Sequence, residues 1–101
     1  MNPILQKALP EISAIMKKHN VIKAFAFGSV TGNSFGEGSD LDFIVSFNEG
    51  QPAESYSDNY FELLFSLEKM FSRKIDLLTE NNLRNPYLRS EIDKSRQLIY
   101  G

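Results

Sequence analysis

The chain has 101 residues, of which 42% are hydrophobic and 24% charged, with a net charge of −2 and no cysteine. A chain of this length builds one hydrophobic core, so we expect a single domain over residues 1–101. The lack of cysteine excludes disulfides and thiolate metal sites and is typical of a reducing compartment, so we expect a cytoplasmic protein. The acidic balance disfavours binding of long nucleic acid, and no apolar run is long enough to span a bilayer, so we expect no membrane contact.

Residues 3–19 have the spacing of a helix with a proline in its middle. Apolar side chains recur at intervals of three and four after Pro10, and proline suits the first turn of a helix. We therefore expect a helix that begins at Pro10, preceded by a short helix over residues 3–9 that the proline kinks or stops. We expect His19 to lie on the surface at the end of this helix. Residues 21–27 are mostly apolar and are followed by glycine, which favours a buried strand.

A glycine-rich segment joins this strand to a second one. The segment, called here the glycine loop (Thr31–Ser39), holds three glycines and three small polar residues, which predicts a flexible connection. Residues 40–47 then alternate with the two-residue period of a strand that packs on a core by one face. The predicted core face carries Leu41, Phe43, Val45 and Phe47. The opposite face carries Asp40, Asp42, Ile44 and Ser46.

The second half of the chain predicts two helices and a third strand. Side chains at helical spacing predict a long helix, and we expect its aromatic stripe, made of Phe61, Phe65 and Phe71, to belong to the core. Residues 74–79 form a short apolar run that Asp76 interrupts, which predicts a strand. The Asn85-Pro86 pair predicts the start of a final helix, whose apolar face extends to Ile99. We expect the basic residues beside the third strand and on the final helix to be solvated.

The predicted order of elements is helix, strand, loop, strand, helix, strand, helix. Such an order is typical of a small α+β domain. We expect helices packed on one face of a small mixed sheet of three or four strands. The remaining elements then support the segment Gly28–Asp42, in which the chemically informative residues are concentrated.

Two carboxylates lie two residues apart at the start of the second strand. Asp40 and Asp42 project from the same face, because side chains at i and i+2 of a strand point the same way. Carboxylates this close repel each other unless a cation lies between them, and Mg²⁺ is bound by one or two carboxylates together with nucleotide phosphates. If the strand over residues 74–79 is a neighbour, Asp76 joins the pair, and the three carboxylates suit two metal ions.

Gly28 and Ser29 directly follow the first predicted strand. Backbone N–H groups at such a turn can bind an anion, glycine lets phosphate approach the main chain, and the serine hydroxyl adds a hydrogen bond. Together with the carboxylates, this turn points to a metal-bound nucleoside triphosphate. Nucleotidyl transfer depends on positioning and charge neutralisation and needs no nucleophilic side chain, which agrees with a chain that has no cysteine and one histidine.

The motif that starts at Gly28-Ser29 and continues after ten residues with Asp40-Leu41-Asp42 resembles the signature of the DNA polymerase beta-like nucleotidyltransferases. The resemblance is strongest to their smallest members, the minimal nucleotidyltransferases (MNT proteins). Residues 74–78 resemble the family's third carboxylate strand, and residues 85–101 resemble its C-terminal helix.

The resemblance implies a set of roles for these residues. Gly28 and Ser29 hold the triphosphate, and Asp40, Asp42 and Asp76 bind Mg²⁺ and form the catalytic set. One departure concerns the glycine loop, where Gly32 and Asn33 stand in place of an Arg-Gly pair that many family members have. The missing arginine removes a contact to phosphate or acceptor, so it affects efficiency and acceptor choice more than metal binding.

The resemblance also implies a partner. Family members of this size often accompany a HEPN-type protein, a helical RNase toxin, and act as its antitoxin. The implied reaction transfers AMP from ATP to a tyrosine of that partner. An alternative stays open, in which the chain is a catalytically weak or inactive binding module that neutralises or assembles with a HEPN-type protein. A homodimer and a heteromer are both compatible with the sequence.

Overall fold

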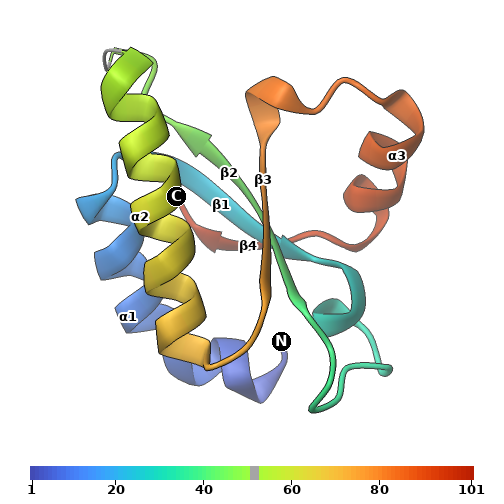
Figure 1. Cartoon of the computed structure of the whole chain (residues 1–101). Coiled ribbons are helices and arrows are strands. Elements are labelled where there is room, and N and C mark those ends of the chain that lie inside the picture. The colour runs from blue at the N-terminus through green and yellow to red at the C-terminus, as the bar shows by residue number, and fades with distance from the viewer. Residues whose placement is uncertain (51–52) are drawn as a thin grey trace.

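The computed structural model describes residues 1–50 and 53–101 and shows helices and strands around one sheet (Figure 1). In chain order the described elements are α1 (Pro3–Lys18), β1 (Val21–Phe27), η1 (Gly28–Thr31), β2 (Leu41–Phe47), α2 (Ala53–Phe71), β3 (Ile75–Thr79), η2 (Glu80–Asn82), α3 (Pro86–Ser95) and β4 (Gln97–Tyr100). The two η elements are short 3-10 helices that follow β1 and β3. The predicted α+β fold class is confirmed.

The sheet has the strand order β3-β2-β1-β4. β1 runs antiparallel to both of its neighbours, β2 and β4, whereas β2 and β3 run parallel. Parallel neighbours need a long crossover connection, and α2 provides it. The sheet is therefore mixed, as predicted, and its parallel pair is the one that carries the aspartates.

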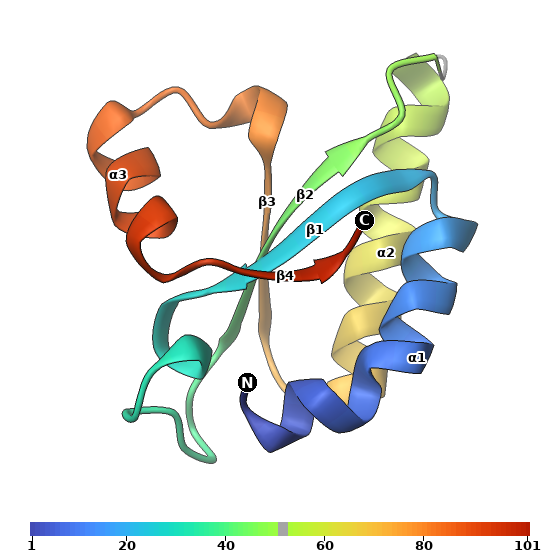
Figure 2. The same ribbon diagram turned by 180° about the vertical axis from the view of Figure 1, so that it is seen from behind.

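The helices form two layers on the sheet. α1 and α2 lie side by side against one face, and α3 lies on the other side of the sheet (Figures 1 and 2). The predicted core face of β2 is confirmed, because Leu41, Phe43, Val45 and Phe47 are all buried in the main cluster beneath α1 and α2. On the other face, Ile44 packs with Phe27 and with Ile92 of α3 in a smaller cluster. The predicted helical layer on one face thus consists of α1 and α2. α3 instead packs against the opposite face of the sheet.

α1 continues through Pro10 as one helix, so the predicted start of a separate helix at Pro10 is wrong. The side chain of Asn2 caps the helix. Pro10 has no N–H to donate to the carbonyl one turn earlier, and because Pro10 is exposed, that carbonyl lies on the solvent side of the helix. The predicted surface position of His19 is also wrong. His19 is 4% exposed, with Nδ1 lying 2.8 Å from the Ile15 carbonyl oxygen and Nε2 lying 3.8 Å from a carboxylate oxygen of Glu62.

The end of the chain forms a strand where a helix was predicted. α3 ends at Ser95, and β4 pairs antiparallel with β1. The strand has a physical advantage over a longer helix, because it buries Ile99 in the main core and adds a hydrogen-bonded edge to β1. Isoleucine and tyrosine also favour strands over helices.

The predicted aromatic stripe of α2 is wrong for two of its three members. Phe61 and Phe65 are 53% and 61% exposed, with their ring centroids 6.3 Å apart. α2 instead faces the sheet with a neighbouring stripe that contains the fully buried Leu63 and Leu67. Phe71 does contact the core, with its ring centroid 6.0 Å from that of Phe43. No helix among the described residues is long and apolar enough to cross a membrane.

Candidate functional site

Three of the residues predicted for the site, Gly28, Asp42 and Asp76, lie on or directly beside three neighbouring strands. Phe27, the last residue of β1, is the Cα partner of Asp42 on β2, and Asp42 is in turn the partner of Asp76 on β3. The condition on which the carboxylate argument depended, that these two strands are neighbours, is therefore met. Leu41 and Leu77 point into the main core, so the alternation of side chains places Asp42 and Asp76 on the opposite face, the one that carries α3.

The aspartates influence one another electrostatically. Burial, followed by the negative charges of Asp76 and of Asp40, raises the pKa of Asp42 from 3.8 to about 6. Asp40 precedes β2, and its carboxylate lies 3.9 Å from the ammonium group of Lys74. Both side chains of that pair are largely exposed, so solvent screens it. Asp42 is consequently the central carboxylate, because the charges of both other aspartates act on it.

Gly28 occupies a position that only glycine can fill. Its φ angle is +77°, in the left-handed region, and a Cβ at this position would overlap a carboxylate oxygen of Asp42. On the other side, the N–H of Gly28 donates a hydrogen bond of 3.1 Å to Oγ of Ser95 at the end of α3. The carbonyl of Gly28 accepts a hydrogen bond of 2.8 Å from the hydroxyl of Thr31. The turn that carries Gly28 and Ser29 is thus held in contact with the aspartate group.

A cleft of about 510 Å³ opens between this turn and α3. Its size lies within the range of small-molecule sites. Apolar residues of β1 and α3 line it, together with polar residues and glycines of the turn, the glycine loop and α3. The lining residues are Phe27, Gly28, Ser29, Gly32, Ser34, Leu88, Glu91, Ile92, Lys94 and Ser95. Gly28 and Ser29 line the cleft, whereas Asp40, Asp42 and Asp76 do not, and Asp42 borders the cleft lining only through its contact with Gly28.

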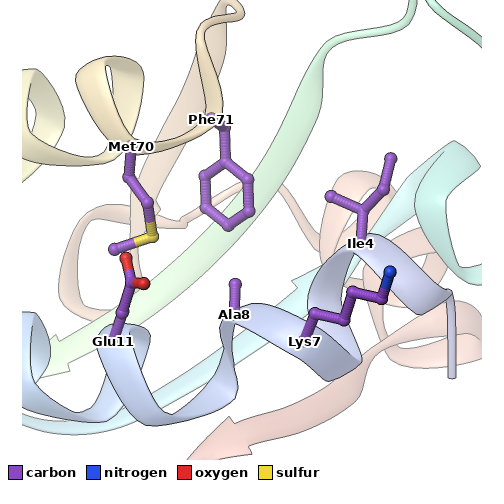
Figure 3. A pocket seen from close by; sticks show the side chains of 6 residues that line it. All are labelled: Ile4, Lys7, Ala8, Glu11, Met70 and Phe71. Carbon is purple, nitrogen blue, oxygen red and sulfur yellow. The ribbon is translucent and has the colours of Figure 1, made fainter.

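A second cavity, of about 360 Å³, lies between α1 and α2 (Figure 3). Met70 and Phe71 from the end of α2 face Ala8 and Glu11 of α1 across it (Figure 3). None of the residues predicted for the site line this cavity. We therefore assign it no part in the site.

Arg73 organises the glycine loop, a role that the sequence did not reveal. Its guanidinium donates hydrogen bonds of 3.0 Å and 2.9 Å to the carbonyl oxygens of Gly36 and Ser39. It also stacks over the ring of Phe35 at 4.5 Å from the centroid. The loop is thereby fastened to the segment between α2 and β3. No local pattern signals a side chain that binds backbone carbonyls so far away along the chain.

Two arginines that were expected to be solvated hold α3 in place. Glu80, directly after β3, accepts hydrogen bonds from Arg89 of α3 at 2.9 Å and from Arg96 at 3.2 Å. Arg96 also stacks over Phe25 of β1, 4.5 Å from the ring centroid. These contacts tie both ends of α3 to the sheet, so the expectation of a solvated basic face is wrong for Arg89 and Arg96.

Within residues 1–50 and 53–101, no group of three or more His, Cys, Asp or Glu side chains stands in an arrangement ready to hold a metal ion. The chemistry of the donor set nonetheless fits a hard divalent cation. The carboxylates of Asp76 and Asp40 add to the effect of burial in raising the pKa of Asp42, and a cation would relieve the repulsion among the three groups. These residues can hold such an ion if their side chains adjust.

Residues 9–99 match the family model described as "Nucleotidyltransferase domain". The chain therefore belongs to the nucleotidyltransferase family, as its motif predicted. Two similar proteins come from Methanocaldococcus jannaschii and are named "Putative protein adenylyltransferase". MJ1379 is 38% identical over 102 residues, which cover 93% of this chain and 98% of the relative. MJ0435 is 36% identical over 92 residues, which cover 91% of this chain and 89% of the relative.

Solved structures confirm the likeness to minimal nucleotidyltransferases. One described as "Structure of putative minimal nucleotidyltransferase" superposes with a TM-score of 0.75 at 26% identity and covers 93% of this chain and 91% of its own. Another contains a tri-AMPylated HEPN toxin in complex with MNT antitoxin from Shewanella oneidensis, with a TM-score of 0.67 at 15% identity over 96% of this chain and 72% of the other. At that identity the second likeness concerns the fold alone.

Proposed function

We propose that this protein is a Mg²⁺-dependent adenylyltransferase that moves AMP from ATP to a hydroxyl group of a partner protein. The observation that carries the proposal is the pairing of Asp42 with Asp76 on adjacent strands, next to Gly28 at the end of β1, which lines a cleft of suitable size. The names of the relatives support protein adenylylation. The MNT–HEPN complex among the fold neighbours supports a HEPN-type protein as acceptor and an antitoxin role.

The proposed roles follow from where each residue lies. Gly28 and Ser29 bind the triphosphate, through backbone N–H groups of the turn and the serine hydroxyl. Asp40, Asp42 and Asp76 hold the metal, which we expect to be two Mg²⁺ ions. When bound, the metal neutralises charge on both the phosphates and the carboxylates.

The reaction itself needs few groups from this chain. The hydroxyl oxygen of the acceptor attacks the α-phosphate of ATP, the bond to the leaving pyrophosphate breaks, and the hydroxyl proton passes to a carboxylate. Asp76 is the proposed proton acceptor, because its side chain is exposed at the edge strand β3 where a partner protein can approach. The orientation of ATP in the cleft supplies most of the remaining acceleration.

A transfer assay tests this proposal. The protein is incubated with Mg²⁺, ATP labelled at the α-phosphate, and the protein encoded by the neighbouring gene, and the label on that second protein is counted. We expect transfer by the wild type, loss of at least about 100-fold in Asp76→Asn, and full transfer by the control Asp58→Asn on the exposed side of α2. Absence of transfer by the wild type with any nucleoside triphosphate would overturn the enzymatic proposal.

The alternative is a binding module that covers its partner without catalysis. The observation in its favour is that the carboxylates do not stand in a ready metal-binding arrangement in the described part of the chain. Thermal unfolding separates the two functions. Ligand at 100 times its dissociation constant stabilises a folded protein by about 2.7 kcal/mol, so an active site predicts a clear rise in melting temperature with Mg²⁺ and ATP. An unchanged melting temperature favours the binding module.

A further inference from the structure

We propose that the last turn of α3 is the second wall of the phosphate site, in which Lys94 binds the triphosphate and Ser95 positions the turn at Gly28. This inference rests on the proposed function, because it requires a nucleotide in the cleft between η1 and α3. It extends that function to two residues of α3, which lies outside the motif over Gly28–Asp42. Three observations support it.

The first observation is the contact between Ser95 and the turn. The N–H of Gly28 donates to Oγ of Ser95 at 3.1 Å, across a separation of 67 residues in the sequence. The carboxylate of Asp42 occupies the space into which a side chain on Gly28 would project. The peptide that begins the turn is therefore held between α3 and the aspartates. Ser95 sets its orientation, and with it the direction in which the N–H groups of the turn face the cleft.

The second observation is the position of Lys94. Among the described residues that line the cleft, Lys94 is the sole cation and shares the wall with Gly28, Ser29 and the anionic Glu91. Its ammonium group lies 3.1 Å from Glu91 in an exposed pair, which solvent weakens. Lys94 can therefore exchange Glu91 for a phosphate, whose higher charge attracts the ammonium group more strongly.

The third observation is the lack of another cation at this place. Residues 28–39, which include the turn and the glycine loop, contain neither lysine nor arginine. Arg73 is engaged with two carbonyl oxygens of the loop, and Lys74 lies beside Asp40. The carbonyl end of a helix also repels anions, so phosphate near the end of α3 requires a positive charge there. Lys94 is the residue that supplies it.

The end of α3 is rigid enough to serve as a wall. Arg96, directly after Ser95, is bound to Glu80 at 3.2 Å and to Asp93 at 3.3 Å, and it stacks over Phe25. Ile92 is buried against Phe27 and Ile44 of the sheet. The last turn of α3 is thus anchored on both sides of Lys94 and Ser95, and their distance from Gly28 is set by the fold.

Calorimetric titration with Mg²⁺ and ATP, and separately with inorganic tripolyphosphate, tests the role of Lys94. We expect Lys94→Gln to weaken both ligands about 10-fold, which corresponds to one charge-assisted contact, and Lys94→Arg to stay within about 3-fold of the wild type. The matched control is Lys18→Gln in the last turn of α1, an exposed lysine remote from the cleft, which should bind as the wild type does. Wild-type affinity of Lys94→Gln for tripolyphosphate would overturn the assignment.

The role of Ser95 is tested with Ser95→Ala, Ser95→Thr and the control Ser90→Ala on the exposed side of α3. We expect Ser95→Ala to weaken ATP binding several-fold and to accelerate hydrogen exchange of the Gly28 amide, with both effects reversed in Ser95→Thr. Unchanged exchange at Gly28 in Ser95→Ala would overturn the positioning role. A wild type that binds neither ligand would instead refute the proposed function, so the two failures are distinguishable.

Discussion

Replacing Asp42 by asparagine should stabilise the ligand-free protein above pH 6. The pKa of Asp42 is raised to about 6 by burial and by the charges of Asp76 and Asp40, so the folded state prefers the protonated carboxyl. Stability from this group is fully present below the unfolded pKa of 3.8 and is lost as the pH rises through 6. Asparagine imitates the neutral carboxyl at every pH and therefore removes the loss.

The size of the effect follows from the same values. A rise from 3.8 to about 6 corresponds to about 3 kcal/mol, and solvent around this partly exposed carboxylate reduces the effect to about 1–2 kcal/mol. A domain of this length gains about 4–8 °C in melting temperature per kcal/mol. We therefore expect Asp42→Asn to melt about 5–10 °C higher than the wild type at pH 7.5.

Thermal unfolding in the presence of a chelator, at pH 7.5 and at pH 4, measures this difference. The advantage of Asp42→Asn should shrink towards zero at pH 4, where the wild-type carboxyl is protonated. The control Asp58→Asn removes an exposed charge of α2 and should leave the melting temperature unchanged at both values. Equal or lower stability of Asp42→Asn at pH 7.5, or a gain that persists undiminished at pH 4, would refute the electrostatic reasoning.

Three further predictions concern the surroundings of the site. Gly28→Ala forces a side chain into Asp42 and strains a positive φ, so denaturant unfolding should show a loss of about 1–3 kcal/mol and titration should show no ATP binding. Phe61→Ser should change the free energy of unfolding by less than about 0.5 kcal/mol, whereas Leu63→Ala should cost about 2–5 kcal/mol, and a large loss in the former would contradict the orientation of α2. Arg73→Ala removes two hydrogen bonds to the glycine loop and should speed its proteolysis several-fold, with unaltered cleavage counting against the fastening role.

The local structure around the residues proposed for the site was predictable because its signals are local. Alternation along β2 determines which face Asp42 occupies once Phe43 is assigned to the core. A glycine at the end of β1 signals a turn, and the positive φ at Gly28 confirms that the turn needs it. The sequence alone did not establish that β2 pairs with β3, because strand pairing and register depend on contacts across the sheet. The direct pairing of Asp42 with Asp76 confirms it.

The errors concern features that depend on distant parts of the chain. α2 is apolar on more than one side, so spacing alone does not distinguish the stripe with Leu63 from the stripe with Phe61, and docking on the sheet decides. β4 is four residues long, too short for its period to stand out from the end of the preceding helix. Pro10 stays within α1 because the packing of one helical face outweighs a single missing hydrogen bond on the solvent side.

The parallel pairing of β2 with β3 also governs when the protein can acquire a ligand. Two strands that run the same way cannot meet through a tight hairpin, so Asp42 and Asp76 come together only after α2 has crossed over and settled on the sheet. A partly folded chain therefore lacks the carboxylate pair altogether. Under the proposed function, binding of a nucleotide with its cation therefore requires that α2 and β3 have docked against β2.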